Sequence, residues 1–434
     1  MSDTRFVRTE MLPEKAPPAA TGGALGWLRT NLFYSVASSI ATLVTVAVLG
    51  WLAWSLLIWL AVPTWVAGSL GDCRSIIAEL GRDDHGGGAC WGVIRERSMQ
   101  LLFGFYPKYL YWRPILALLL LAPALAPVLF SDKVPRQLLW VTLAYPFVMP
   151  WLLWGGNVWL PVGAALGFVI GLVAFRAAQS VVGELAAGFI GLAAALIWWL
   201  VLLTPITSAL ASVLPLELEP VKSRNFGGFT LSLTIGLVAI GVSLPLGILL
   251  ALGRRSHLLL IKAICVAFIE LIRGVPLITL LFVASTLLNI FLPPGTEFDI
   301  IMRVIIMATL FASAYMAEVI RGGLAALPSG QYEAADSLGL DYWKSMRLII
   351  MPQALKVSIP GIVSRFIALF KDTTLVSIIG LLDPLGFTTA IRANQEWAGI
   401  VWELYGFIAV LFFIVTYSMS RYSLHLERKL HRGH

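Results

Sequence analysis

The sequence predicts an all-α polytopic membrane protein with about ten transmembrane helices. Of its 434 residues, 59% are hydrophobic and 13% are charged, against about 25% charged residues in an ordinary soluble domain. The hydrophobic residues gather in runs of about 20, the length that a helix needs to cross the hydrocarbon core of a bilayer. Lys and Arg gather in short segments between these runs, as the positive-inside rule expects of cytoplasmic ends. The net charge of +7 therefore indicates membrane orientation, not nucleic-acid binding.

The chain opens with a polar segment, residues 1–31, that contains basic residues and a Pro-rich patch. The first apolar run, 32–60, starts too late and is too long to be a cleavable signal peptide. We therefore expect a cytoplasmic tail and then a retained helix, the first of about five in an N-terminal extension, 32–222. The other expected spans of the extension are 114–131, 138–154, 157–175 and 184–204. Only a thin polar break separates the last two, and an eight-span version of the chain merges or buries them. A polar stretch is expected from Pro205 to Gly228.

The second part of the chain, 223–434, is expected to hold five more spans. The apolar runs that predict them are 229–252, 258–291, 299–321, 355–380 and 402–420. The run 258–291 is longer than one span needs, so it predicts a long or broken helix. Ten crossings place both termini in the cytoplasm, and the bias of Lys and Arg agrees with this orientation. Every motif that carries chemistry lies in this second part.

Two cysteines, Cys73 and Cys90, share a long polar segment between predicted spans, 63–113. If this loop faces an oxidising periplasm, the two thiols can form a disulfide, and unpaired thiols are the alternative. A metal site is not expected, because His85 is the only further soft ligand nearby in the sequence. Cys265 lies inside an apolar run and is interpreted as a small packing residue.

A compact segment of mixed polarity, Ala325–Pro352, interrupts the apolar pattern between two spans. Ser329 is a candidate N-cap for a short helix, and Gly339 can adopt the left-handed conformation that ends it. Asp341 can then cap a second helix, which is expected to break or kink at Pro352 because proline lacks an N–H.

Apolar residues, Leu338 among them, give the first of these helices and its turn an apolar side. Helix, glycine turn and helix together form a small knob with a carboxylate at its tip. On a cytoplasmic loop, such a knob can fit a groove in another protein. A loop that re-enters the membrane interface is the alternative.

Within this knob, Glu333-Ala334-Ala335 is followed after three residues by Gly339 and after nine more by Ile349-Ile350-Met351-Pro352. This spacing resembles the EAA loop of ABC-importer permeases, with Met351 in place of the usual leucine. The motifs that narrow the resemblance to the histidine/glutamine-type permeases for polar amino acids are Glu270–Pro276, Ala317–Gly323, Gln353–Leu355 and Phe370–Ser377. The long extension resembles that of permeases of general L-amino-acid and glutamate/glutamine/aspartate/asparagine uptake systems.

The resemblance implies that the second part is a five-helix type I ABC-importer permease core, whose knob near 325–352 is a coupling helix that docks on a cytoplasmic ATPase. The residues that it assigns to coupling are Glu333, Ala334, Ala335, Asp336, Gly339 and Pro352. The sequence contains no G-x-x-x-x-G-K-[ST] phosphate loop, which a nucleotide-binding chain of this kind needs. No cofactor is therefore expected on this chain, and ATP and Mg are expected on the partner ATPase.

The resemblance also implies an assembly in the bacterial inner membrane. The expected partners are a second homologous permease chain in a heterodimer, two ATP-binding subunits, a periplasmic amino-acid-binding protein and membrane lipid. In such an assembly this chain forms half of the translocation pathway.

Ionisable residues inside spans are costly and are candidates for function. Glu270 and Arg273 are three residues apart and share a helix face, and Glu318 and Arg321 repeat this spacing. A zwitterionic or acidic substrate needs donors for its carboxylate and acceptors for its amine. The candidates for the substrate pathway or gate are Glu270, Arg273, Asn289, Arg303, Glu318, Arg321, Arg365, Asp372, Thr373, Thr374 and Ser377. The alternative for each is helix packing or interfacial snorkelling.

Two other classes of function receive less support. No Ser/His/Asp arrangement or metal-ligand spacing appears along the predicted core spans, so an intramembrane enzyme is not expected. A secondary amino-acid transporter driven by an ion gradient is the competing hypothesis. It predicts inverted repeats and broken midplane helices, and it leaves the EAA segment unexplained.

Overall fold

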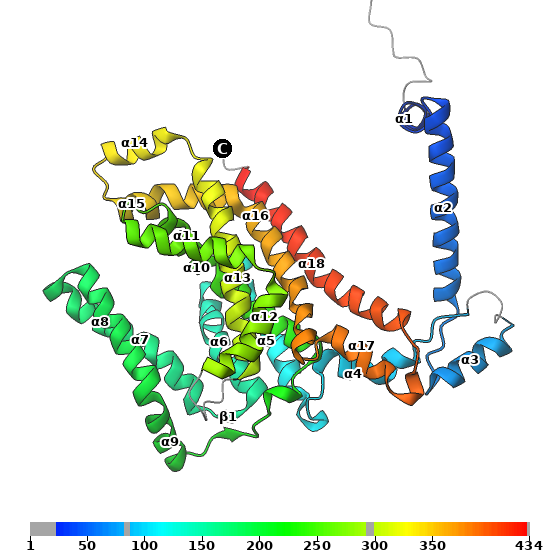
Figure 1. Cartoon of the computed structure of the whole chain (residues 1–434), viewed down its shortest axis with the longest axis horizontal. Helices are drawn as coiled ribbons and strands as arrows, with labels where there is room; N and C mark the ends of the chain where they lie inside the picture. The colour runs from blue at the N-terminus through cyan, green and yellow to red at the C-terminus, as the bar shows by residue number, and fades with distance from the viewer. Residues whose placement is uncertain (1–22, 82–86, 292–298, 432–434) are drawn as a thin grey trace, which may run out of the picture. The chain divides into compact units, whose positions relative to one another are not determined.

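The computed structural model describes residues 23–81, 87–291 and 299–431, apart from the side chains of residue 185 and residues 287–291. In this part the fold is helical (Figure 1), and its one sheet pairs β1 (Gly156–Asn157) with β2 (Glu217–Leu218). Eight of the described helices are long and apolar enough to cross a membrane, and up to ten spans result if each of two bent helix pairs counts as one. The expected all-α polytopic fold is confirmed.

Two compact units make up the chain, residues 1–92 and residues 93–434. The first contains α1 (Gly23–Asn31), α2 (Val36–Ala61) and α3 (Leu70–Glu79). None of the residues of α2 is buried within the chain. A helix that is apolar on every side and uncovered by protein needs lipid around it, so α2 fits the first expected span.

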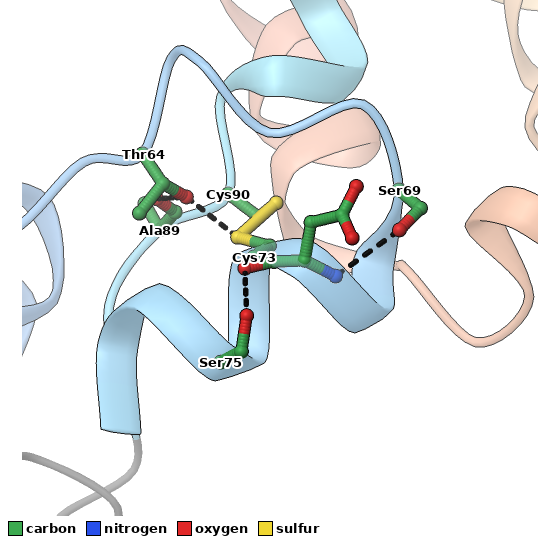
Figure 2. Close-up of a disulfide and its surroundings, with 7 residues drawn as sticks. Thr64, Ser69, Cys73, Ser75, Ala89 and Cys90 are labelled. Carbon is green, nitrogen blue, oxygen red and sulfur yellow. Dashed lines mark hydrogen bonds between the residues drawn. A yellow bond between two sulfur atoms is a disulfide. The ribbon is translucent and has the colours of Figure 1, made fainter. Parts of the chain in front are cut away.

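The segment after α2 is held together by a disulfide between Cys73 and Cys90 (Figure 2). The backbone supports it, because the N–H of Thr64 donates to the carbonyl of Ala89 at 2.9 Å. Ser69 caps α3 by accepting a hydrogen bond from the N–H of Asp72 at 3.1 Å. The disulfide thus ties the start of α3 to the chain that leaves this unit.

Replacing both Cys73 and Cys90 by serine is expected to lower the stability of this unit by up to about 3 kcal/mol, the chain-entropy value for a closed loop of this size. Transport should fall less than stability. Limited proteolysis measures the loss, and non-reducing mass spectrometry of protein from untreated cells should show the linked peptides. Free thiols at both positions under oxidising conditions would remove the disulfide and weaken the periplasmic placement of the loop.

The second unit begins with helices from the N-terminal extension. They are α4 (Gly92–Phe103), α5 (Trp112–Leu129), α6 (Leu139–Trp154), α7 (Trp159–Val182), α8 (Glu184–Ile197) and α9 (Leu203–Val213). The runs expected at 157–175 and 184–204 are separate helices, and a π-helical turn joins α8 to α9. The expected polar stretch from Pro205 is wrong at its start, because the span continues to Val213. Pro205 is the third residue of α9 and lies just after this π-helical turn, so it does not end the span.

The family-like part of the second unit follows. Its helices are α10 (Gly228–Arg254), α11 (Leu259–Gly274), α12 (Leu277–Phe291), α13 (Ile300–Ala325), α14 (Ser329–Ser337), α15 (Tyr342–Ser345), α16 (Met351–Asp372), α17 (Pro384–Arg392) and α18 (Trp402–His431). Of the long or broken helix expected at 258–291, the structure shows the broken form, because α12 turns by 101° from α11. The cause is Pro276, which forces the preceding Val275 into an extended conformation (φ −113°, ψ 133°).

One hydrophobic core joins the extension to the permease-like helices. Tyr106 and Met149 from the extension share it with Phe226, Leu231 and Val304. The domain boundary expected at residues 222 and 223 therefore lies inside the second unit.

The ends of α10 define two ends of the second unit. The 27 residues of α10 span about 40 Å at 1.5 Å per residue, about the thickness of a bilayer. Figure 1 shows α14 and α15 at one end of the bundle, and α4 and α17 at the other. We call these the α14 end and the α17 end.

Candidate functional site

The knob at the α14 end is built by two short helices and a glycine turn. The N–H of Gly339 donates to the carbonyl of Asp336 at 2.9 Å, and Gly339 has a φ of +69°. Asp341 caps α15 by accepting from the N–H of Lys344 at 2.9 Å, and this N–H holds the pKa of Asp341 below its usual value. The expected N-cap at Ser329 is wrong. Pro328 occupies the cap position, and α14 has no side-chain cap.

Of the break or kink expected at Pro352, the break does not occur. After α15 the helix continues through a π-helical turn, Met346–Ile350, directly into α16. The N–H of Met351 reaches back to the carbonyl of Met346 in this turn. Pro352 then occupies the second position of α16, and the wider turn ahead of it accommodates the missing N–H.

The knob presents a surface with carboxylates and large apolar side chains. Ala335 is fully buried and packs inward, whereas Leu338 is 72% exposed. The expected apolar side is therefore divided, because Ala335 packs inward whereas Leu338 lies in the turn after α14, which ends at Ser337, and is exposed. We define the α14 surface as the exposed residues Glu333, Ala334, Asp336, Leu338 and Trp343.

Three contacts fix α14 to the spans. The guanidinium of Arg255, at the end of α10, donates to the hydroxyl of Tyr332 at 3.0 Å and lies over its ring. The amide of Gln353 on α16 donates to Gln331 at 2.9 Å. A displacement of α14 therefore acts directly on α10 and α16.

Five charged residues meet next to this anchor, and we call them the charge cluster: Arg254, Glu270, Arg273, Glu318 and Arg321. Glu318 is its centre. It contacts Arg254 at 2.5 Å, Arg321 at 3.0 Å and Arg273 at 3.8 Å. Arg254 also pairs with Glu270 at 2.9 Å, and the expected pair of Glu270 with Arg273 is present at 3.9 Å. The cluster joins α10, α11 and α13.

Sequence spacing alone identified four of these five residues. It missed Arg254, which is 64 residues from Glu318 and was interpreted only as part of a cytoplasmic loop. The signal that could have found it is the position of Arg254 at the end of α10, where a cation favours the helix C-terminus and can reach a carboxylate on a neighbouring helix.

An aromatic residue, Tyr315, connects the cluster to a cavity between α13 and α16. The guanidinium of Arg273 lies 5.6 Å from its ring centroid, and that of Arg365 lies 4.8 Å from it. Arg365, Asp372 and Tyr315 line the small cavity together with Phe311 and Phe366. Two groups of opposite charge therefore lie two helical turns apart on one face of α16, beside aromatic rings.

The other candidate pathway residues make contacts within their own helices or nearby. Thr373, Thr374 and Ser377 lie on the turn η7 (Thr373–Ile379), and their hydroxyls donate to carbonyls three residues earlier. Arg303 donates to the carbonyl of Ser285 at 3.0 Å. Asn289 lies on α12, but its side chain is outside the described part. Within the described residues, no group of three His, Cys, Asp or Glu could hold a metal ion.

Comparison with known proteins places these features in a family. The glutamate/glutamine/aspartate/asparagine transport system permease protein BztC of Rhodobacter capsulatus is 56% identical over 435 residues, and the alignment covers 100% of both chains. A family model described as binding-protein-dependent transport system inner membrane component matches residues 243–432. The chain belongs to this family.

A second relative and a solved structure are also similar to this chain. The inner membrane amino-acid ABC transporter permease protein YhdY of Escherichia coli is 38% identical over 418 residues, which cover 94% of each chain. A solved structure titled as an amino acid ABC transporter with histidines is 31% identical, with a TM-score of 0.41, and covers 46% of this chain and 90% of its own.

The family assignment defines the general role of the chain. It is an inner-membrane permease subunit of an ABC importer, with a transport and not a catalytic role. The family implies ATPase and substrate-binding partners. The secondary-transporter hypothesis receives no support.

Proposed function

We propose that this chain is one permease subunit of an ATP-driven importer for glutamate, glutamine, aspartate and asparagine, or for L-amino acids more generally. The observation that carries the proposal is full-length similarity, at 56% identity, to a permease named for these four amino acids. The chain forms half of the pathway beside a second homologous permease. Both termini lie in the cytoplasm, and two separate subunits bind ATP and Mg.

In this proposal the α14 surface docks on the ATPase subunit. Its exposed carboxylates, Glu333 and Asp336, suit basic residues of a partner. Leu338 and Trp343 supply the apolar anchor that such interfaces need. The small side chain of Ala334 permits close approach of the partner. Ala335 is buried, and α14 packs against the π-helical turn beneath it.

Movement of α14 then passes to the membrane spans through a series of direct contacts. Tyr332 transmits it to Arg255, and the adjacent Arg254 carries it into the charge cluster. From there Arg273 and Tyr315 reach Arg365 at the cavity. The charge cluster therefore acts as the inner gate element that responds to the ATPase.

The cavity provides complementary groups for an amino acid. Arg365 offers donors to a carboxylate, and Asp372 offers an acceptor to an ammonium group. Seven residues separate them on α16, a rise of about 10 Å.

Uptake by proteoliposomes that contain this chain and its partner subunits tests the proposal. Uptake of the four amino acids should require ATP and loaded binding protein, and collapse of the proton and sodium gradients should leave it intact. Uptake that continues without ATP and stops with the ion gradient would overturn the proposal in favour of secondary transport.

Replacing Arg365 by glutamine is expected to raise the KM of uptake at least tenfold, because the carboxylate of the substrate loses its charged donor. ATP hydrolysis stimulated by the binding protein should change less. Lys356→Gln is the matched control, since it removes a positive charge from the same helix outside the cavity lining. Equal KM values for the two variants would remove Arg365 from the substrate path.

A further inference from the structure

The N-terminal extension contacts the permease-like helices directly at the α17 end. The contacted segment, which we call the α17 segment, runs from Leu382, just before the N-cap Asp383 of α17, to Trp397 in the short helix η8 (Gln395–Trp397). The indole N–H of Trp397, which is 0% exposed, donates to Glu96 Oε2 on α4 at 3.2 Å. The guanidinium of Arg97 donates to Glu396 Oε2, also at 3.2 Å.

Backbones meet directly beside these side-chain contacts. A Cβ on Gly104, just after α4, would lie 2.6 Å from the Cα of Gly227, and one on Gly227 would lie 2.7 Å from the carbonyl oxygen of Leu382. The N–H of Gly228 donates to that same carbonyl at 2.8 Å. The end of α4, the start of α10 and the start of the α17 segment therefore cross without room for a side chain.

The position of this crossing in the bundle indicates which partner it can affect. It lies at the α17 end, about one membrane thickness from the α14 surface. If the ATPase docks at the α14 end, then the protein that delivers substrate docks at the α17 end. The α17 segment exposes Arg392, Gln395 and Glu396 there. None of α4 falls within the residues 243–432 that match the family.

We propose that α4 is a brace that positions the α17 segment for docking of the substrate-loaded binding protein. The inference rests on the proposed function and assigns a task to part of the extension. Glu96 and Arg97 are positioning residues. They set the geometry of a surface that the partner touches, and they take no part in ATP hydrolysis or in the inner gate.

A charge exchange tests the brace in the complete reconstituted complex, with ATP hydrolysis measured against the concentration of loaded binding protein. Arg97→Glu and Glu396→Arg should each raise the half-saturating concentration about tenfold, with the maximal rate within twofold of the unmodified complex. The double exchange should restore the half-saturating concentration to within about threefold. Met99→Ala, an exposed change on the same helix, should leave both values unchanged.

Two outcomes of the charge exchange would contradict the proposal that α4 is a brace. One is an unchanged half-saturating concentration in both single variants, and another is a fall in maximal rate that the double exchange does not reverse. Failure of the unmodified complex to respond to binding protein would instead contradict the proposed function itself.

A second measurement asks whether the contact stays closed during transport. Cysteines placed at Arg97 and Glu396 and joined by a bifunctional maleimide should leave stimulated hydrolysis at half or more of its value before joining, because a brace does not move. Loss of more than nine tenths on joining would show that α4 and the α17 segment separate during the cycle, and the brace would be wrong.

Discussion

Gly339→Val is expected to reduce binding-protein-stimulated ATP hydrolysis and amino-acid uptake together, by tenfold or more. Gly339 has a φ of +69°, where a side chain costs about 1–2 kcal/mol and a β-branched one costs more. The turn would rearrange and direct the α14 surface away from its partner. The residue lies outside every span, so membrane insertion and pairing with the second permease should persist.

Gly330→Val provides the matched control for this change. Gly330 lies on α14, the helix that leads into the turn at Gly339. It has no positive φ, and a Cβ there would meet open space. The Gly330→Val variant should retain most of the ATP hydrolysis that the binding protein stimulates. Glu333→Arg should reproduce the loss by setting a like charge against the basic contact expected on the partner. If Gly339→Val retained full hydrolysis and uptake, or changed the preference among amino acids at constant hydrolysis, α14 would not be the coupling element.

Glu318→Gln is expected to be the most damaging single change in the charge cluster. Glu318 is 17% exposed and contacts three arginines, so its loss leaves three guanidinium groups facing one another without their common carboxylate. A hydrogen bond to a charged group contributes about 1.5–3 kcal/mol, and the two that Arg254 and Arg321 donate to Glu318 lose their charged acceptor here. Thermal unfolding in nanodiscs should show a lower midpoint, and uptake should fall with it.

Glu270→Gln is the comparison for this experiment. Glu270 is 54% exposed and contacts two of the same arginines, and solvent screens exposed pairs. The midpoint of thermal unfolding should fall less than half as far in Glu270→Gln as in Glu318→Gln. Adding Arg254→Gln to Glu318→Gln should recover part of the loss by removing one uncompensated charge. Equal effects of the two glutamate changes would show that Glu318 is not the centre of the cluster.

Local sequence signals predicted the site best where backbone chemistry decides the structure. The turn at Gly339 and the cap at Asp341 each depend on one or two residues and their neighbours. Spacing of three along a helix likewise predicted the pair of Glu318 with Arg321. Such signals act within one or two turns, so a single sequence is enough to reveal them.

Local sequence signals failed where a contact with a distant segment, or a change from α-helix to π-helix, decides the structure. Pro352 predicted a break or a kink, but the π-helical turn before it continues into α16 without a break. Arg254 joins Glu318 only because α10 and α13 pack together. Trp397 and Glu96 are separated by most of the sequence, and no local pattern predicts their contact. The coupling and pathway roles of the candidate residues stay predictions that the experiments above test.

The contact between α4 and the α17 segment also sets an order of events during biosynthesis. Arg97 and Glu396 are 299 residues apart in the sequence, and Glu96 and Trp397 are 301 apart. A chain that enters the membrane helix by helix from its N-terminus must therefore hold α4 without its partner until nearly every other segment has been synthesised. Ribosome-bound chains that stop short of Trp397 should therefore expose α4 to protease more than the complete chain does, and this protection should appear only once the α17 segment has been synthesised.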